Sequence, residues 1–212
     1  MPGPDVVVIG GSAGGIGALR GIFQTLDDVR NRVVVVVLHR APQYGGLAPV
    51  LQGFSAIPIH EPDTSPWACP SGEVTLAPAG YHLLVGNDRR RSTRPQTPIE
   101  QYDTGPDVRA HLTLDGPVLC SRPSLDVVFG SAATLVNSVT AVLLSCASED
   151  GADGCAIVRA AGGRVVLQDP ASCEAALAVN AAMRKLDPDH VADPQGIGRW
   201  LSGSAKPHAH RR

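Results

Sequence analysis

Residues 5–23 read DVVVIGGSAGGIGALRGIF and place one serine inside a cluster of glycines. Apolar residues precede the cluster and a helical pattern follows it, which indicates a turn between a strand and a helix. Gly10, Ser12 and Gly14 match Gly-x-Ser-x-Gly, the elbow in which such a turn lifts a serine hydroxyl clear of a sheet. The helix N-terminus behind the turn favours developing negative charge. Ser12 is therefore a candidate nucleophile.

Two other interpretations of this turn are open. A phosphate-binding P-loop has Lys and Ser/Thr after its second glycine, but Ile16 and Gly17 stand there. The dinucleotide fingerprint Gly-x-Gly-x-x-Gly, counted from Gly10, puts Ser12 where a glycine must admit the pyrophosphate. A nucleotide-binding domain is thus the less favoured alternative. The simplest alternative is that Ser12 only caps the following helix.

Two further residues stand at the ends of predicted strands. His39 ends the run RVVVVVLH, and Asp150 follows the run AVLLS. Catalytic groups in open α/β sheets collect beyond the carboxyl ends of the strands, so Ser12, His39 and Asp150 are expected at one rim. A loop histidine and a turn aspartate are each common alone, but three agreeing strand ends favour a Ser-His-Asp triad. In it His39 takes the serine proton and Asp150 holds the imidazole tautomer.

The elements that must position these residues alternate along the chain. Apolar runs without alternation predict strands buried on both faces of a parallel sheet, at residues 5–10, 32–39, 138–145 and 163–169. Helical patterns occupy residues 15–26, 124–136 and 151–163, and in the first of them Ile16, Leu19, Ile22, Phe23 and Leu26 form one apolar stripe. The sequence predicts an α/β fold: a doubly wound, mostly parallel sheet with helices on both faces and a β-hairpin at the edge.

The middle of the chain has a different pattern. Short strand candidates between residues 56 and 85 are interrupted by proline and glycine, which indicates hairpins at a sheet edge or a small flap. Residues 86–117 are polar and predict a loop or an irregular hairpin. One catalytic domain is expected over residues 1–190, with a partly disordered tail over residues 191–212.

Composition narrows the functional classes. With 212 residues, 43% apolar content and a formal net charge of -2, the chain can bury a core and offers no electrostatic reason to bind nucleic acid or an anionic membrane. The five cysteines form no Cys-x-x-Cys pair, so neither a disulfide framework nor a metal site is expected. No segment has the pattern of a membrane span or a signal peptide. We expect a cytoplasmic protein that needs no cofactor.

Several separated motifs together resemble the catalytic domain of the bacterial chemotaxis protein-glutamate methylesterase (CheB-type) family. The resemblance runs through VVVIGGSAGGIGAL, VVVLHRAP, VTLAPAGYHLLV, RPSLDVVF, SEDGADG and GGRVVLQDPASC, over roughly residues 5–184. It implies a Rossmann-like esterase in which Ser12, His39 and Asp150 are catalytic. The implied substrate is a methylated chemoreceptor-like protein, whose glutamate γ-methyl esters are hydrolysed, and glutamine deamidation is implied as well.

The chain departs from this family pattern in two respects. The family usually carries a receiver domain before the esterase, and none is expected here, so the regulator is unknown. The family's Thr-Gly-Met-Gly is replaced by residues 145–148, SCAS. The resemblance gives the oxyanion hole to the N–H groups of Ala13 and Ala147. Since glycine adopts positive φ more easily than Cys146 or Ser148, a displaced donor and weak activity are expected. A catalytically weak signalling or binding protein is the alternative function.

Overall fold

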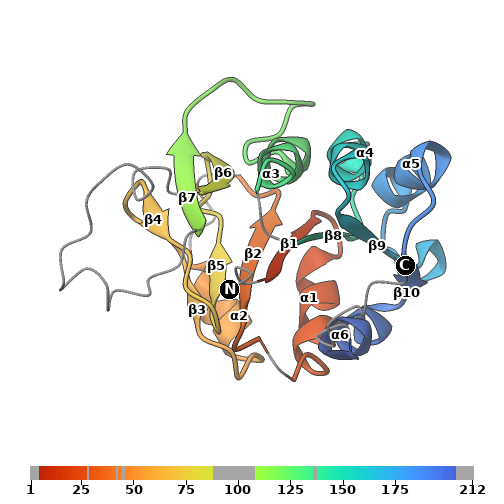
Figure 1. Ribbon diagram of the computed structural model, residues 1–212, viewed down its shortest axis with the longest axis horizontal. Helices are drawn as coiled ribbons and strands as arrows, with labels where there is room; N and C mark the ends of the chain where they lie inside the picture. The colour runs from red at the N-terminus through yellow and green to blue at the C-terminus, as the bar shows by residue number, and fades with distance from the viewer. Residues whose placement is uncertain are drawn as a thin grey trace, which may run out of the picture.

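A computed structural model describes residues 5–203 except 28, 42, 44–45, 88–107 and 136–137. In these residues seven parallel strands form one sheet in the order β10-β9-β8-β1-β2-β5-β3, and three strands form a second sheet in the order β4-β7-β6 (Figure 1). The strands of the main sheet are β1 (Asp5–Gly11), β2 (Arg32–Leu38), β3 (Ile59–His60), β5 (Val74–Leu76), β8 (Val139–Leu143), β9 (Arg164–Gln168) and β10 (His190–Ala192). The small sheet has β4 (Trp67–Ala68), β6 (His82–Asn87) and β7 (Val108–Thr113).

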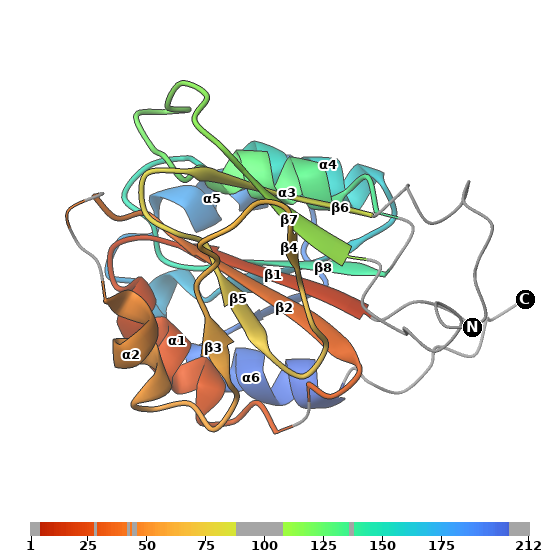
Figure 2. The ribbon, with the colours of Figure 1, turned by 90° about the vertical axis from the view of Figure 1, so that its left-hand side faces the viewer.

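The central strands are apolar because both of their faces are covered. Helices α1 (Gly15–Phe23), α2 (Leu47–Gln52) and α6 (Pro194–Gly203) lie on one face, and α3 (Leu125–Ala132), α4 (Ala152–Ala160) and α5 (Leu177–Lys185) lie on the other (Figure 2). A short 3-10 helix, Pro170–Ser172, follows β9. All seven residues of β2 are buried. The doubly wound sheet with helices on both faces is confirmed.

The order of the strands fixes where a site can form. The chain builds outward from β1 through β2 to one edge, then returns to place β8 on the other side of β1. The helices that follow β1 and β8 therefore lie on opposite faces, and a crevice opens between the two strand ends. Ligands of open α/β sheets bind at this kind of reversal point.

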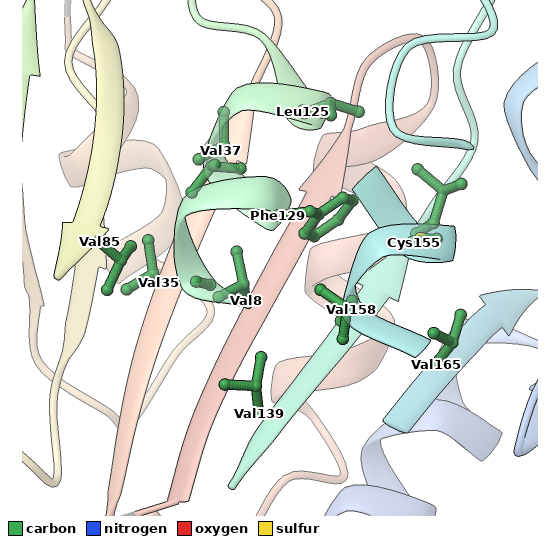
Figure 3. Packing of buried hydrophobic residues seen from close by; sticks show 14 of the residues in the cluster. Val8, Val35, Val37, Val85, Leu125, Phe129, Val139, Cys155, Val158 and Val165 are labelled. Carbon is green, nitrogen blue, oxygen red and sulfur yellow. The ribbon is translucent and has the colours of Figure 1, made fainter. Parts of the chain in front are cut away.

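One side of the core requires close approach between α3 and β1. Figure 3 shows Phe129 of α3 in the space between α3, α4 and the strand β1. A Cβ atom added to Gly10 would lie 2.9 Å from Cζ of Phe129 and 3.0 Å from Cδ2 of Leu125. One added to Gly154 would lie 2.7 Å from Cβ of Phe129. Glycine at these positions lets α3 pack tightly, and α3 in turn borders the site.

Three details differ from the sequence prediction. Ile16 of the expected apolar stripe is 46% exposed, while the other members of the stripe are buried. β3 and β5 pair in parallel at the edge of the main sheet and form no hairpin, because β5 adds to β2. The antiparallel hairpin is formed by β6 and β7 in the small sheet, and residues 88–107 between them lie outside the described residues.

The packed structure continues beyond the expected domain boundary at residue 190. β10 pairs with β9, and α6 packs with buried Ile197 and Leu201 against the face that carries α1. Residues 191–203 of the expected tail therefore lie in regular structure, and residues 204–212 lie outside the described residues. Among the described helices, none has the length and apolar character needed to cross a membrane.

Candidate active site

The ends of β1 and β2 place Ser12 and His39 side by side. Gly11 pairs with Leu38 in the parallel register, and the N–H of His39 donates to the carbonyl of Gly11 at 3.0 Å. The N–H of Ser12 donates to the carbonyl of Ser145 beyond β8 at 2.9 Å. Main-chain hydrogen bonds thus join the ends of three neighbouring strands at the crevice.

The hydroxyl of Ser12, in the turn after β1, takes no part in capping the following helix. The N-cap of α1 is Gly14, with φ 75° and no side-chain hydrogen bond to the helix, so the interpretation that Ser12 caps the helix is wrong. A Cβ atom on Gly14 would lie 2.8 Å from Cβ of Glu174, which adds a steric reason for glycine. In the described residues the half-buried Ser12 side chain makes no hydrogen bond. Its hydroxyl is available for chemistry.

His39 and Asp150 form a direct pair across the crevice. Nε2 of His39 lies 2.7 Å from Oδ2 of Asp150, and their side chains are 13% and 0% exposed. A carboxylate can only accept here, so Nε2 carries the proton and Nδ1 is the nitrogen left to act as a base. The structure brings together the two members of the candidate triad that lie 111 residues apart.

The N-terminus of α3 binds the Asp150 carboxylate. Oγ of Ser124 and the N–H of Asp126 donate to Oδ1 at 2.8 and 3.0 Å, and the N–H of Leu125 donates to Oδ2 at 2.8 Å. Burial by itself raises the pKa of Asp150, but the bonds from His39 and from these donors outweigh burial and lower it. Asp150 therefore stays ionised. This role of Ser124 was not predicted, although a serine just before an apolar helical run is the usual signal of an N-cap.

The pKa of His39 is shifted upward, in the opposite direction to that of Asp150. Burial alone lowers the pKa of His39, but hydrogen bonds with Asp150 and Cys146, together with their negative charge, raise it to about 9. Sγ of Cys146 lies 3.9 Å from Nδ1, and the pKa of this thiol is lowered: burial alone raises it, and the bonds to His39 and Ser148 outweigh burial. Cys146 was not predicted as a residue of the site, although its position just after a strand end was a signal for it.

The SCAS segment does not use the left-handed backbone angles that favour glycine. The described non-glycine residues with positive φ are Leu119 and Cys120, so Cys146 and Ser148 do not occupy the region that favours glycine. The N–H of Cys146 donates to the carbonyl of Ala175, and the N–H of Ser145 donates to Oε1 of Gln168, both at 2.9 Å. These two hydrogen bonds from main-chain N–H groups hold Ser145 and Cys146 in place, so the segment does not need the backbone freedom of glycine.

The two expected oxyanion donors flank this crevice. Ala13 is half-buried after Ser12, and Ala147 is exposed after Cys146. Within the described residues, no hydrogen bond engages the N–H of Ala13 or of Ala147. Main-chain N–H groups without partners are the kind of donor that can stabilise a developing oxyanion.

Two cavities adjoin His39. One of about 540 Å³ contains Ser12 and His39, with apolar walls from Ile16, Leu47 and Val50. The other, of about 490 Å³, is lined by His39, Ser121 and Arg122, and Arg40 lines both cavities. The exposure of Ile16 is explained by its place in the wall of the first cavity. In the part of the chain that the structure describes, no group of three or more His, Cys, Asp or Glu side chains has the arrangement of a metal site.

Comparisons with known proteins identify the family of the chain. The family model CheB methylesterase matches residues 7–201. A putative protein-glutamate methylesterase/protein-glutamine glutaminase of Leptospira interrogans is 32% identical over 195 residues, which cover 91% of each chain. A protein-glutamate methylesterase/protein-glutamine glutaminase of Trichodesmium erythraeum is 31% identical over 170 residues, 79% of this chain and 44% of that protein.

A solved structure gives the same result for the fold. The crystal structure of the Thermotoga maritima CheB methylesterase catalytic domain matches with a TM-score of 0.79 over 97% of this chain and 100% of that one, at 24% identity. The match shows the fold, and the family model and the relatives show the kinship. The chain belongs to the CheB methylesterase family.

Proposed function

We propose that this protein hydrolyses glutamate γ-methyl esters on chemoreceptor-like proteins, with Ser12, His39 and Asp150 as its catalytic triad. The observation that carries the proposal is the buried hydrogen bond between His39 and Asp150. His39 also lines one cavity together with Ser12, whose hydroxyl makes no hydrogen bond in the described residues. The names of the relatives support the substrate and add glutamine deamidation as a second reaction of the same site.

Acylation starts at the Ser12 hydroxyl. Oγ attacks the ester carbonyl while its proton passes to Nδ1 of His39, and the imidazolium that forms is stabilised by Asp150 through Nε2. The N–H groups of Ala13 and Ala147 bind the oxyanion. His39 then gives its proton to the departing methoxide, so methanol leaves and a glutamyl ester of Ser12 remains.

Deacylation repeats these steps with water. Neutral His39 takes a proton from the water as it attacks the acyl-enzyme, and returns that proton to Oγ of Ser12 when free glutamate is released. With glutamine as substrate the same sequence releases ammonia in place of methanol. Every step uses groups of the chain and water.

The test is Ser12→Ala. Triad serines contribute factors of roughly 10⁴ to 10⁶ to turnover, whereas a half-buried hydroxyl without hydrogen bonds contributes little to packing. We expect the variant to fold, to release no methanol from a methylated receptor, and to resist labelling by a fluorophosphonate. Methanol release within a few-fold of wild type by the folded variant would remove Ser12 as the nucleophile.

A second candidate function is a methylesterase-like signalling or binding protein with weak catalysis. Two observations favour it: no hydrogen bond joins Ser12 to His39 in the described residues, and a pKa of about 9 keeps His39 protonated at neutral pH. Labelling decides between the two functions, because an active triad reacts with a fluorophosphonate in a Ser12-dependent manner and an inactive one does not.

A further inference from the structure

The base nitrogen of His39 already has a partner, and that partner is not Ser12. Oγ of Ser121 lies 3.3 Å from Nδ1, closer than Sγ of Cys146 at 3.9 Å, while Nε2 is held by Asp150 at 2.7 Å. Both ring nitrogens are therefore engaged, and in the described residues the Ser12 hydroxyl has no hydrogen bond. The nitrogen that must accept the Ser12 proton is held by a different serine.

A tight turn fixes Ser121 in this position. Val118 and Ser121 exchange main-chain hydrogen bonds of 3.1 and 2.8 Å around a two-residue turn. The two turn residues have φ of 45° and 62°, the signs that a type I′ turn requires. Nη1 of Arg122 donates to the carbonyls of residues 114 and 115, each at 3.1 Å. These contacts tie Ser121 to its loop, which Figure 2 shows at the end of the molecule where β1 and β2 end.

Ser121 carries a neutral hydroxyl, whereas the other groups considered around His39 are charged or titratable. The groups that face His39 or its partner carboxylate are Asp150 and Cys146 from the β8–α4 connection, Asp126 from α3, Arg40 after β2 and Arg122 before α3. Arg40 donates to Glu61 and to the carbonyl of Ala77 at 2.9 Å. A serine hydroxyl among these groups can donate to neutral imidazole and accept from imidazolium, so it satisfies Nδ1 in both protonation states.

We propose that Ser121 is a positioning residue that holds Nδ1 of His39 in the resting enzyme and must release it before Ser12 reacts. The inference rests on the proposed function, because it assigns Nδ1 as the base. A neutral imidazole has one lone pair in its plane, and it accepts one well-aligned hydrogen bond. While Ser121 donates to that lone pair, the Ser12 proton has no acceptor. Release of Ser121 is thus a step that precedes acylation.

Loss of the Ser121 hydroxyl therefore speeds acylation at neutral pH. A neutral hydrogen bond of this kind contributes a factor of about two to ten, and removing it frees the lone pair for Ser12. The bond that Ser121 accepts from the imidazolium is the stronger one because it is charge-assisted. Its loss lowers the pKa of His39 and enlarges the fraction of neutral base, which acts in the same direction.

The experiment compares Ser121→Ala, Ser121→Thr and wild type in the full chain. We measure the rate of fluorophosphonate labelling between pH 6 and 10 and titrate the His39 imidazole by NMR, its signal assigned by loss in a His39→Gln protein. Ser121→Thr keeps the hydroxyl, and Cys120→Ala changes the same turn without touching this hydrogen bond. We expect Ser121→Ala to label about two- to tenfold faster at pH 7 with a lower His39 pKa, and both control variants to resemble wild type.

Two results would overturn the inference. Labelling of folded Ser121→Ala that is slower than wild type means that Ser121 assists catalysis, and an unchanged rate with an unchanged titration means that it is a bystander. Failure of the proposed function is seen separately, as labelling that persists in Ser12→Ala. In that case the NMR titration still decides whether Ser121 controls the protonation of His39.

Discussion

Replacing Asp150 by Asn tests the buried pair while keeping its shape. The carboxylate accepts four hydrogen bonds, from His39, Ser124, Leu125 and Asp126, at 2.7 to 3.0 Å. An amide has one oxygen, so its NH₂ group must replace either Oδ1 or Oδ2. In one orientation the N–H of Asp126 loses its acceptor, and in the other that of Leu125 does. A buried donor is left unpaired in both cases.

The size of the effect follows from these contacts. An unpaired buried N–H costs about 1–3 kcal/mol, and removing one partner of a buried charged pair costs about 3–5 kcal/mol. Because the two costs overlap at Asp150, we expect the free energy of unfolding to fall by about 2–5 kcal/mol. When the NH₂ group faces Nε2 of His39, it also forces the proton onto Nδ1. The base is then lost, and turnover falls by roughly 10⁴.

Two measurements check this prediction. Urea unfolding followed by tryptophan fluorescence gives the stability, and methanol release gives the rate. The matched control is Asp153→Asn, which changes a carboxylate that is 67% exposed in the first turn of α4, three residues after Asp150; its unfolding midpoint and rate should stay near wild type. An Asp150→Asn protein as stable as the control and active within tenfold of wild type would refute the assignment of Asp150 as the acceptor of His39 and of α3.

Two remaining predictions concern pH and packing. The rate of Ser12 labelling should rise with pH through an ionisation near 9, because His39 must lose its proton to act as a base, and Cys146→Ala should move that ionisation downward because the thiol raises the pKa of His39. A rate that is flat from pH 7 to 10 would contradict this. Gly10→Ala should lower the free energy of unfolding by about 1–3 kcal/mol, since its Cβ would lie 2.9 Å from the ring of Phe129. Urea unfolding of this variant checks the prediction, and Gly17→Ala, where the added atom meets nothing within 4 Å, is its control.

The sequence alone determined the strands, the helices after them and the rim to which the candidate residues belong. Strands with both faces covered are mostly apolar, so β1, β2, β8 and β9 could be recognised from residue type alone. The positions of Ser12, His39 and Asp150 just beyond strand ends then placed them at one rim, because parallel strands end on the same side. The prediction of the doubly wound fold needed no other information.

Tertiary structure decided what surrounds those residues. Ile16 fits the apolar stripe of α1 but lies in a cavity wall, where it is 46% exposed. β3 and β5 are too short to show their pairing in the sequence: β5 adds in parallel to the edge of β2, and β3 then adds in parallel to β5. The partners of His39 and Asp150 come from residues 121–126, far along the chain from His39. Such contacts depend on how α3 packs against the sheet, and packing between distant segments leaves no local pattern in a sequence.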